Sequence, residues 1–101
     1  MSQPPWVSFL GLAARARKLV TGEELVLKEV RRGSARLILL SADAAEQTKK
    51  KVLDKCSYYN VPVRLIADRK TLGQAIGKAE RVVIALTDEG FAKKMTALLD
   101  Q

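Results

Sequence analysis

The sequence contains no histidine and a single cysteine, Cys56. One thiol cannot close an internal disulfide, which fits a reducing compartment. Catalytic arrangements that pair a serine or cysteine nucleophile with a histidine base are excluded, because the base is missing. A zinc site would have to use mostly carboxylates, whereas structural zinc sites use cysteine and histidine. We therefore expect no catalytic residues, no metal ion and no cofactor.

Aromatic residues and long apolar runs are also scarce. Phe, Trp and Tyr make up 5% of the chain, and Trp6, Tyr58 and Tyr59 are too few and too scattered for a base-stacking platform of the single-strand-binding kind. No run of about 18 apolar residues is present, so we expect no membrane span. Residues 1–5 lack the basic segment and apolar core of a signal peptide. The resulting expectation is a cytoplasmic location.

Basic residues, in contrast, are abundant. Lys and Arg number 18 against 11 Asp and Glu, which gives a formal net charge of +7. This excess predicts attraction to polyanions, of which nucleic acid is the commonest and an acidic membrane surface the competing one. The length of 101 residues fits one domain, and 48% hydrophobic residues suffice for a core. We expect a single domain over residues 1–101 and, since no pattern indicates an obligate dimer, a monomer.

The spacing of apolar residues predicts helices that alternate with extended segments. The predicted helices cover residues 5–18, 23–32, 44–59, 72–77 and 91–99, and the extended segments cover 19–21, 37–40, 61–66 and 82–86. The apolar run Leu37–Leu40 is typical of a strand buried on both faces, whereas Pro62 places its strand near an edge. This order predicts an α/β fold with a parallel or mixed sheet between helices. Ligands of such sheets usually meet the loops at the strand ends.

The helix after Gly22 carries the first candidate site. Glycine lets the backbone come close to a partner, and Glu24, Lys28 and Arg32 follow one another at one-turn intervals. One interpretation is an exposed helix with a weakly stabilising Glu24–Lys28 ion pair. The other is one acceptor and two donors aimed at base edges and phosphates, since lysine suits the acceptors of guanine. Glu23 and Glu24 oppose simple phosphate binding at the helix N-terminus.

Three basic residues, Arg15, Arg17 and Lys18, precede this helix. They are either a solvated helix end or, together with Lys28 and Arg32, part of one positive surface that follows a nucleic-acid backbone.

A second group of candidates follows two of the predicted strands. The loop Ala67–Asp68–Arg69 is either an ordinary turn with Asp68 as a helix cap or a wall for an extruded base, with Arg69 near phosphates. Asp43 is interpreted as the cap of the helix from residue 44, because a phosphate-accepting aspartate also needs an acidic pair on an earlier strand. Cys56 lies in an apolar stripe and is interpreted as a buried packing residue.

Together these segments resemble the YlxQ-type proteins, a bacterial branch of the kink-turn-binding ribosomal-protein family. The resemblance is carried by residues 10–18, 22–33, 35–40, 43–44, 56–62, 71–73 and 76–77. It implies a three-layer α-β-α sandwich around a four-stranded mixed sheet. It also implies binding to RNA that bends sharply beside tandem sheared G·A pairs.

The family's recognition signature reads Gly-x-Asn-Glu-x-x-Lys. Gly22 and Lys28 match it, whereas Glu24 stands in place of the asparagine and Leu25 in place of the acidic or amide residue. The resemblance further implies that residues 67–69 meet an extruded nucleotide. It places two basic residues near phosphates, namely Arg17 and Lys18.

We therefore predict an RNA-binding protein, without catalysis, that stabilises a kinked RNA by binding its bent conformer better than its extended one. In this prediction Lys28 donates to guanine and Glu24 accepts from it. The predicted RNA-binding residues are Arg17, Lys18, Gly22, Glu23, Glu24, Leu25, Lys28, Arg32, Ala67, Asp68 and Arg69.

Two alternatives stay open. The first is a protein-interaction module associated with the translation machinery, which Glu24 and Leu25 favour somewhat. The second is an enzyme or phosphate-accepting receiver, which would require an acidic pocket beside Asp43.

Overall fold

The computed structural model describes residues 3–101, so Met1 and Ser2, part of the segment expected not to be a signal peptide, lie outside the described residues. The helices are α1 (Pro5–Arg15), α2 (Glu23–Arg32), α3 (Glu46–Tyr59), α4 (Arg69–Ala75) and α5 (Glu89–Leu99), and the strands are β1 (Leu19–Thr21), β2 (Leu37–Ser41), β3 (Val63–Ile66) and β4 (Val83–Leu86). The sheet order is β1-β4-β2-β3. β4 runs antiparallel to both of its neighbours, and β2 runs parallel to β3. The mixed sheet is confirmed, and β3, which follows Pro62, is an edge strand as predicted.

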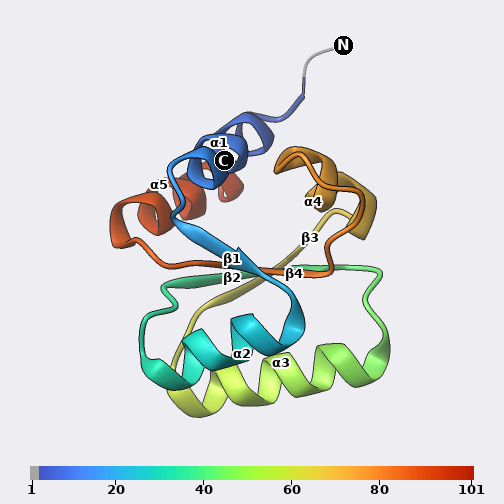
Figure 1. The fold of residues 1–101 in the computed structure, drawn as a ribbon, viewed down its shortest axis with the longest axis vertical. Helices are drawn as coiled ribbons and strands as arrows, with labels where there is room; N and C mark the ends of the chain where they lie inside the picture. The colour runs from blue at the N-terminus through green and yellow to red at the C-terminus, as the bar shows by residue number, and fades with distance from the viewer. Residues whose placement is uncertain (1–2) are drawn as a thin grey trace.

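Helices cover both faces of this sheet (Figure 1). α2 and α3 pack on one face, and α1, α4 and α5 pack on the other. Along β2, Ile38 and Leu40 join the core on the α2–α3 side, whereas Leu37 and Leu39 join the core on the opposite side. This alternation is the two-residue period of a strand. All five residues of β2 are buried, and the three-layer α-β-α sandwich is thereby confirmed.

The buried stripes of the helices also agree with the prediction. Val26, Leu27 and Val30 of α2 are buried, and Cys56 of α3 is 1% exposed. Burial raises the pKa of the Cys56 thiol to about 11. The thiol is therefore protonated at neutral pH, and Cys56 is confirmed as a packing residue. Within residues 3–101, no helix is both long and apolar enough to cross a membrane.

The first helix is shorter than predicted. α1 ends at Arg15 rather than at residue 18, because Arg17 takes a left-handed φ of 59°. The Lys18 amide then donates to the Ala13 carbonyl at 2.9 Å, which satisfies a carbonyl that the ended helix leaves free.

The predicted caps of α3 and α4 have different outcomes. The N-cap position of α3 makes no side-chain hydrogen bond, and the helix begins at Glu46, so the prediction that Asp43 caps it is wrong. The turn after β2 directs Asp43 to α4 instead, where its Oδ1 accepts a hydrogen bond from the Arg69 amide at 3.1 Å. The predicted cap at Asp68 is confirmed, because its Oδ1 accepts from the Thr71 amide at 2.7 Å. α4 consequently begins at Arg69, three residues earlier than predicted.

The strand directions bring four turns to one end of the sheet. β1, β2 and β3 run the same way and β4 runs against them. The turns β1–α2, β2–α3, β3–α4 and α4–β4 therefore lie together, on the right in Figure 1. In open α/β sheets this is the end at which ligands bind.

Candidate nucleic-acid interface

Gly22 forms the corner between β1 and α2. Its φ of 94° and ψ of 142° belong to a region that glycine alone adopts readily. Its amide donates to the Val83 carbonyl at 3.3 Å, and its carbonyl accepts from the Val26 amide at 2.9 Å. A Cβ built on Gly22 would meet no atom within 4 Å. The backbone at this corner is thus held in place on one side and open on the other.

A hollow of about 540 Å³ lies beside this corner. Its walls are Thr21, Gly22, Glu23, Thr48 and the segment 80–83. The Arg81 Nε donates to the Thr21 hydroxyl at 3.2 Å, so the loop between α4 and β4 lies directly against the end of β1. The sequence interpretation gave this loop no role. Its basic residues Lys78 and Arg81, following Gly77 and preceding a buried strand, are the signal that could have found it.

A second hollow, of about 370 Å³, continues along β1. It is lined by Ala14, Arg15, Leu19, Val20, Thr21, Ile76 and Lys78. The two hollows share Thr21, and β1 is an edge strand of the sheet. Arg81 borders the hollow at the Gly22 corner, and Arg15 and Lys78 border the hollow along β1. These two neighbouring hollows are together named the β1 depression below.

The exposed side of α2 borders the same corner. This side exposes Glu24, Leu25, Lys28 and Arg32. Leu25 is 56% exposed although its side chain is apolar. The Glu24–Lys28 ion pair considered from the sequence does not form, and no ion pair within residues 3–101 includes Lys28. Arg32 pairs with Glu29 at 3.3 Å. The Lys28 ammonium is thus available to a partner.

Glu23 turns away from this exposed side and ties α2 to α3. Its Oε1 accepts from the Thr48 hydroxyl at 3.3 Å, and its Oε2 accepts from the Lys51 ammonium at 2.8 Å. The hydrogen bond from Lys51 is the main reason that the pKa of Glu23 is lowered. Lys51 compensates the charge that was expected to repel phosphate at this helix start, and Glu24 is the carboxylate left exposed there.

Arg17 and Lys18 are exposed, but they lie at the opposite end of β1 from Gly22. The four residue steps from Lys18 to Gly22 along β1 separate the two sites by about 13 Å. The structure therefore does not bring Arg17 and Lys18 to the Gly22 corner. Arg15 and Lys78 are the basic residues that line the intervening depression.

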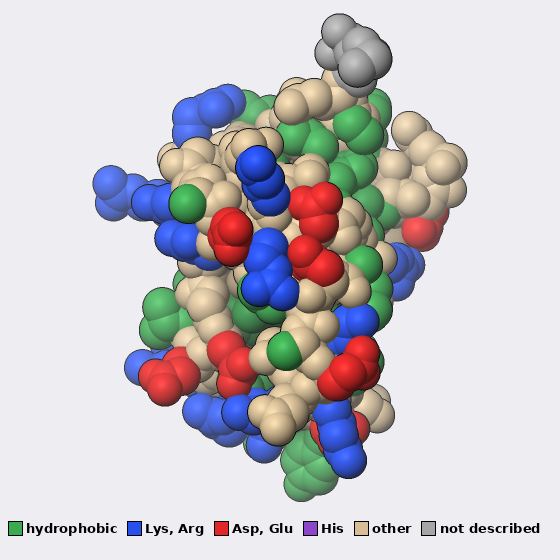
Figure 2. Space-filling model, turned by 90° about the vertical axis from the view of Figure 1, so that its right-hand side faces the viewer, with side chains coloured by type: hydrophobic (Ala, Val, Ile, Leu, Met, Phe, Trp, Pro, Cys, Tyr) green, Lys and Arg blue, Asp and Glu red, His purple; other side chains and the backbone are tan. Residues whose placement is uncertain are grey.

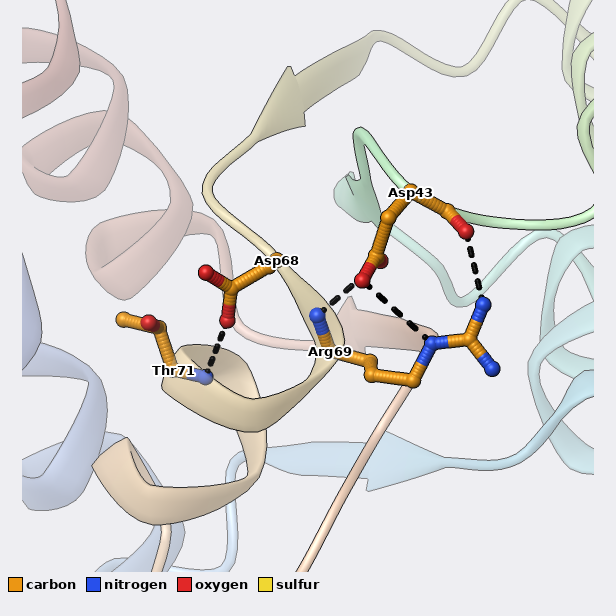
Figure 3. Close-up of polar contacts among 4 residues, drawn as sticks. All are labelled: Asp43, Asp68, Arg69 and Thr71. Carbon is orange, nitrogen blue, oxygen red and sulfur yellow. Dashed lines mark hydrogen bonds and ion pairs between the residues drawn. The ribbon is translucent and has the colours of Figure 1, made fainter.

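The loop after β3 is held by contacts within the protein. The Arg69 Nη2 donates to the Asp43 carbonyl at 2.6 Å, and its Nε lies 3.4 Å from the Asp43 Oδ2 (Figure 3). Desolvation alone would raise the pKa of Asp43, but hydrogen bonds and the Arg69 charge outweigh it and lower that pKa. Ala67, with a left-handed φ of 51°, and Asp68 are exposed. The guanidinium predicted to approach phosphates is thus engaged by Asp43.

The turn-bearing end carries mixed charge. Figure 2 looks onto it and shows Lys and Arg side chains gathered at its upper left, with Asp and Glu interleaved among basic residues at its centre. Among residues 3–101, no three His, Cys, Asp or Glu side chains come close enough to hold a metal ion. Positive charge is therefore concentrated along one margin of this end rather than spread evenly over it.

The chain resembles known proteins over nearly its whole length. Residues 6–96 match the model of the ribosomal protein L7Ae/L30e/S12e/Gadd45 family. The chain is 55% identical over 100 residues to the RNA-binding protein YlxQ of Bacillus subtilis (strain 168), which covers 99% of this chain and 100% of that one. It is 45% identical over 94 residues to the RNA-binding protein YlxQ of Enterococcus faecium, which covers 93% of this chain and 90% of that one.

Two solved structures share the fold. A protein with unknown function from Bacillus halodurans C superposes with a TM-score of 0.95 at 55% identity, over 98% of this chain and 100% of that one. The Giardia lamblia 15.5kD RNA binding protein superposes with a TM-score of 0.75 at 23% identity, over 91% of this chain and 85% of that one. The second likeness concerns the fold alone.

Proposed function

The chain belongs to the ribosomal protein L7Ae/L30e/S12e/Gadd45 family as a YlxQ-type member, and on this premise we propose that it binds RNA and stabilises a kink-turn. The protein acts by binding, as a cytoplasmic monomer and without a catalytic step. The names of the two YlxQ relatives support RNA as the ligand, and ribosomal RNA is one candidate source.

The observation that carries the proposal is the open backbone at Gly22 with basic groups around it. A partner can reach the corner without displacing a side chain, because no atom lies within 4 Å of a Cβ built there. Lys28 stands on the exposed side of α2, and Arg81 and Lys78 border the β1 depression. A bent RNA presents base edges and two converging backbones, so it can meet this corner and its margins together, which a straight duplex cannot.

Each group has a defined role in the proposal. Lys28 donates to the O6 and N7 acceptors of a guanine in the bent stem, and Glu24 accepts from a base amino or imino group. Arg32 together with the more distant Arg17 and Lys18 contacts phosphates outside the kink. Leu25 replaces a polar residue of the family signature and offers only an apolar contact.

The hollow beside Gly22 is suited to an unstacked nucleotide. Its volume of about 540 Å³ exceeds that of a base, and it opens at the end of the sheet where the loop after β3 also lies. Ala67 and Asp68 are exposed at this end but do not line the hollow, so in this proposal they meet the RNA beyond it. The Arg69 guanidinium does not contact phosphate in this proposal, because Asp43 engages it.

A binding comparison tests the function. A hairpin containing a kink-turn and a straight duplex of equal length are titrated with protein at two salt concentrations. We expect tighter binding to the kinked RNA at both concentrations. Equal affinity for the two RNAs, lost in parallel as salt is added, would identify a nonspecific basic protein instead.

Lys28→Ala sharpens this comparison. Removal of one base contact should cost about 1–3 kcal/mol on the kinked RNA, which is about 5- to 150-fold in affinity, with a smaller loss on the straight duplex. Lys93→Ala is the matched control, because Lys93 is exposed on α5 beside Arg36 and Pro62, at the far end of β2. Equal losses on both RNAs would contradict base recognition by Lys28.

Leu25 favours a second candidate function, a protein-interaction module associated with the translation machinery. An apolar side chain that is 56% exposed on a helix suits a protein partner better than a phosphate backbone. If this function holds, a partner captured by the protein should survive nuclease treatment and be lost with Leu25→Ser. Loss of the partner on nuclease treatment would favour RNA as the direct ligand.

A further inference from the structure

Asp43 and Arg69 join two turns that are 26 residues apart in the chain. The Asp43 Oδ1 accepts from the Arg69 amide at 3.1 Å, and the Asp43 carbonyl accepts from the Arg69 Nη2 at 2.6 Å. The Arg69 Nε adds an ion pair at 3.4 Å to the Asp43 Oδ2. Figure 3 shows the guanidinium folded back along Asp43 while the first turn of α4 rises beside it. The first residue of α4 is therefore fixed to the turn after β2.

Arg69 in turn holds the loop between α4 and β4. Its carbonyl accepts a hydrogen bond from the Arg81 amide at 3.0 Å, and the Arg81 side chain reaches the Thr21 hydroxyl at 3.2 Å. Asp43, Arg69, Arg81 and Thr21 thus form one chain of polar contacts. It runs from the turn after β2 to the corner at Gly22.

The loop is also packed rigidly on α4. A Cβ on Gly73 would lie 2.6 Å from the Ala79 carbonyl oxygen and 2.7 Å from the Glu80 Cα. The Lys78 amide donates to the Gly73 carbonyl at 2.8 Å. A displacement of the first turn of α4 therefore moves the loop that carries Lys78 and Arg81.

We propose that Asp43 is a positioning residue for the RNA site: through Arg69 it places the loop between α4 and β4 against the Gly22 corner. The proposal rests on the proposed RNA binding and deepens it. Arg69 acts as a brace within the protein, and Asp43, although acidic, promotes binding to a polyanion. Long-range electrostatics alone predicts the opposite change in affinity on mutation of Asp43, because removing a negative charge should tighten the binding of RNA.

The proposal can be tested because loss of loop positioning weakens RNA binding, whereas loss of a negative charge alone strengthens it. Asp43→Ala, Asp43→Asn and wild type are titrated with the kinked RNA. Asp54→Ala, which removes an exposed carboxylate from α3, serves as the charge control. We expect Asp43→Ala to weaken binding about 3- to 30-fold, the range for coupling through a packed network. Asp43→Asn should lose less, because its amide oxygen can still accept from the Arg69 amide. Asp54→Ala should bind as tightly as wild type or tighter, and the same result for Asp43→Ala would overturn the proposal.

Arg69→Met distinguishes two roles of the Arg69 side chain: holding the protein's own turns together, here called the brace, or contacting an RNA phosphate. A lost phosphate contact would reduce the slope of log affinity against log salt by about 0.7–0.9. The brace predicts weaker binding with the wild-type slope. A reduced slope would assign Arg69 to phosphate and overturn the brace.

Amide hydrogen exchange tests the brace without RNA. In Asp43→Asn, and in Asp43→Ala where it is folded by circular dichroism, the Arg81 amide should exchange faster than in wild type. The Ala92 amide, bonded to the Asp88 carbonyl in α5, should exchange unchanged. An unchanged exchange rate of the Arg81 amide in both variants would refute the brace. If wild type does not prefer kinked RNA but the Arg81 amide responds, the proposed RNA function fails while the brace stands.

Discussion

Replacing Gly73 with alanine should destabilise this protein, although alanine is the better helix former. Gly73 is buried in α4. An added Cβ would lie 2.6 Å from the Ala79 carbonyl oxygen, 2.8 Å from the Ala79 carbonyl carbon and 2.7 Å from the Glu80 Cα. All three atoms belong to the backbone, so no side chain can rotate to relieve the overlap.

The magnitude follows from two opposing terms. The gain in helix propensity is about 1 kcal/mol, and the cost of overpacking a rigid site is about 1–3 kcal/mol. Because the three overlapping atoms are backbone, the cost should lie in the upper half of this range, and the net loss should be about 1–2 kcal/mol. In a domain of this size each kcal/mol lowers the Tm by roughly 4–8 °C. Because the overlap pushes on the loop between α4 and β4, binding to kinked RNA should weaken as well.

Urea and thermal unfolding followed by circular dichroism measure the effect. Gly90→Ala is the matched control in α5, because its Cβ would approach a side-chain atom and no backbone: the Asp88 Oδ2, at 3.2 Å, which accepts the capping hydrogen bond from the Phe91 amide. We expect Gly90→Ala to lose less stability than Gly73→Ala. If Gly73→Ala were as stable as wild type or more so, the close approach of the loop to α4 would be wrong.

Three further predictions concern other parts of the molecule. Gly22→Ala should lower the free energy of unfolding by about 1–3 kcal/mol from backbone strain alone, since its Cβ meets nothing within 4 Å; unchanged urea unfolding would contradict this. The Lys51 hydrogen bond lowers the pKa of Glu23 below 4.5, so its contribution is present above pH 4.5 and is lost as the pH falls through the lowered value. The Tm difference between wild type and Glu23→Gln should therefore shrink from pH 6 to pH 3, and a constant difference would refute the pairing. Cys56, with a pKa raised from 9.0 to about 11, should have a thiolate fraction about 100-fold lower than an ordinary thiol at pH 8. Ellman's reagent should accordingly label it slowly until the protein unfolds, and rapid labelling of native protein would contradict its burial.

Local patterns in the sequence were enough to predict most of the fold. The apolar run Leu37–Leu40 predicted a buried central strand, Gly33 predicted the end of α2, and Asp68 predicted a cap, because each signal acts within a few residues of its effect. The end of α1 was predicted too late. The helix ends where Arg17 takes a left-handed φ, and the sequence has no glycine at that position to indicate such a conformation.

The site was harder to predict because its contacts are distant in the chain. Asp43 lies 26 residues from Arg69, and Glu23 lies 28 residues from Lys51. Local spacing assigned Asp43 to the next helix, where a cap is the common role of an aspartate after a strand. Only the strand order brings the α4–β4 loop, with Arg81, to Gly22.

The central claim is that the protein selects the bent RNA conformer. Fluorescence resonance energy transfer measures this selection directly. The kink-turn RNA carries a donor fluorophore on one helical end and an acceptor fluorophore on the other, and the ionic conditions are chosen so that the free RNA is mostly extended. We predict that transfer efficiency rises to a plateau at one protein per RNA, and that an RNA without the G·A pairs shows no rise. Binding to the labelled kink-turn RNA with unchanged transfer efficiency would contradict the claim.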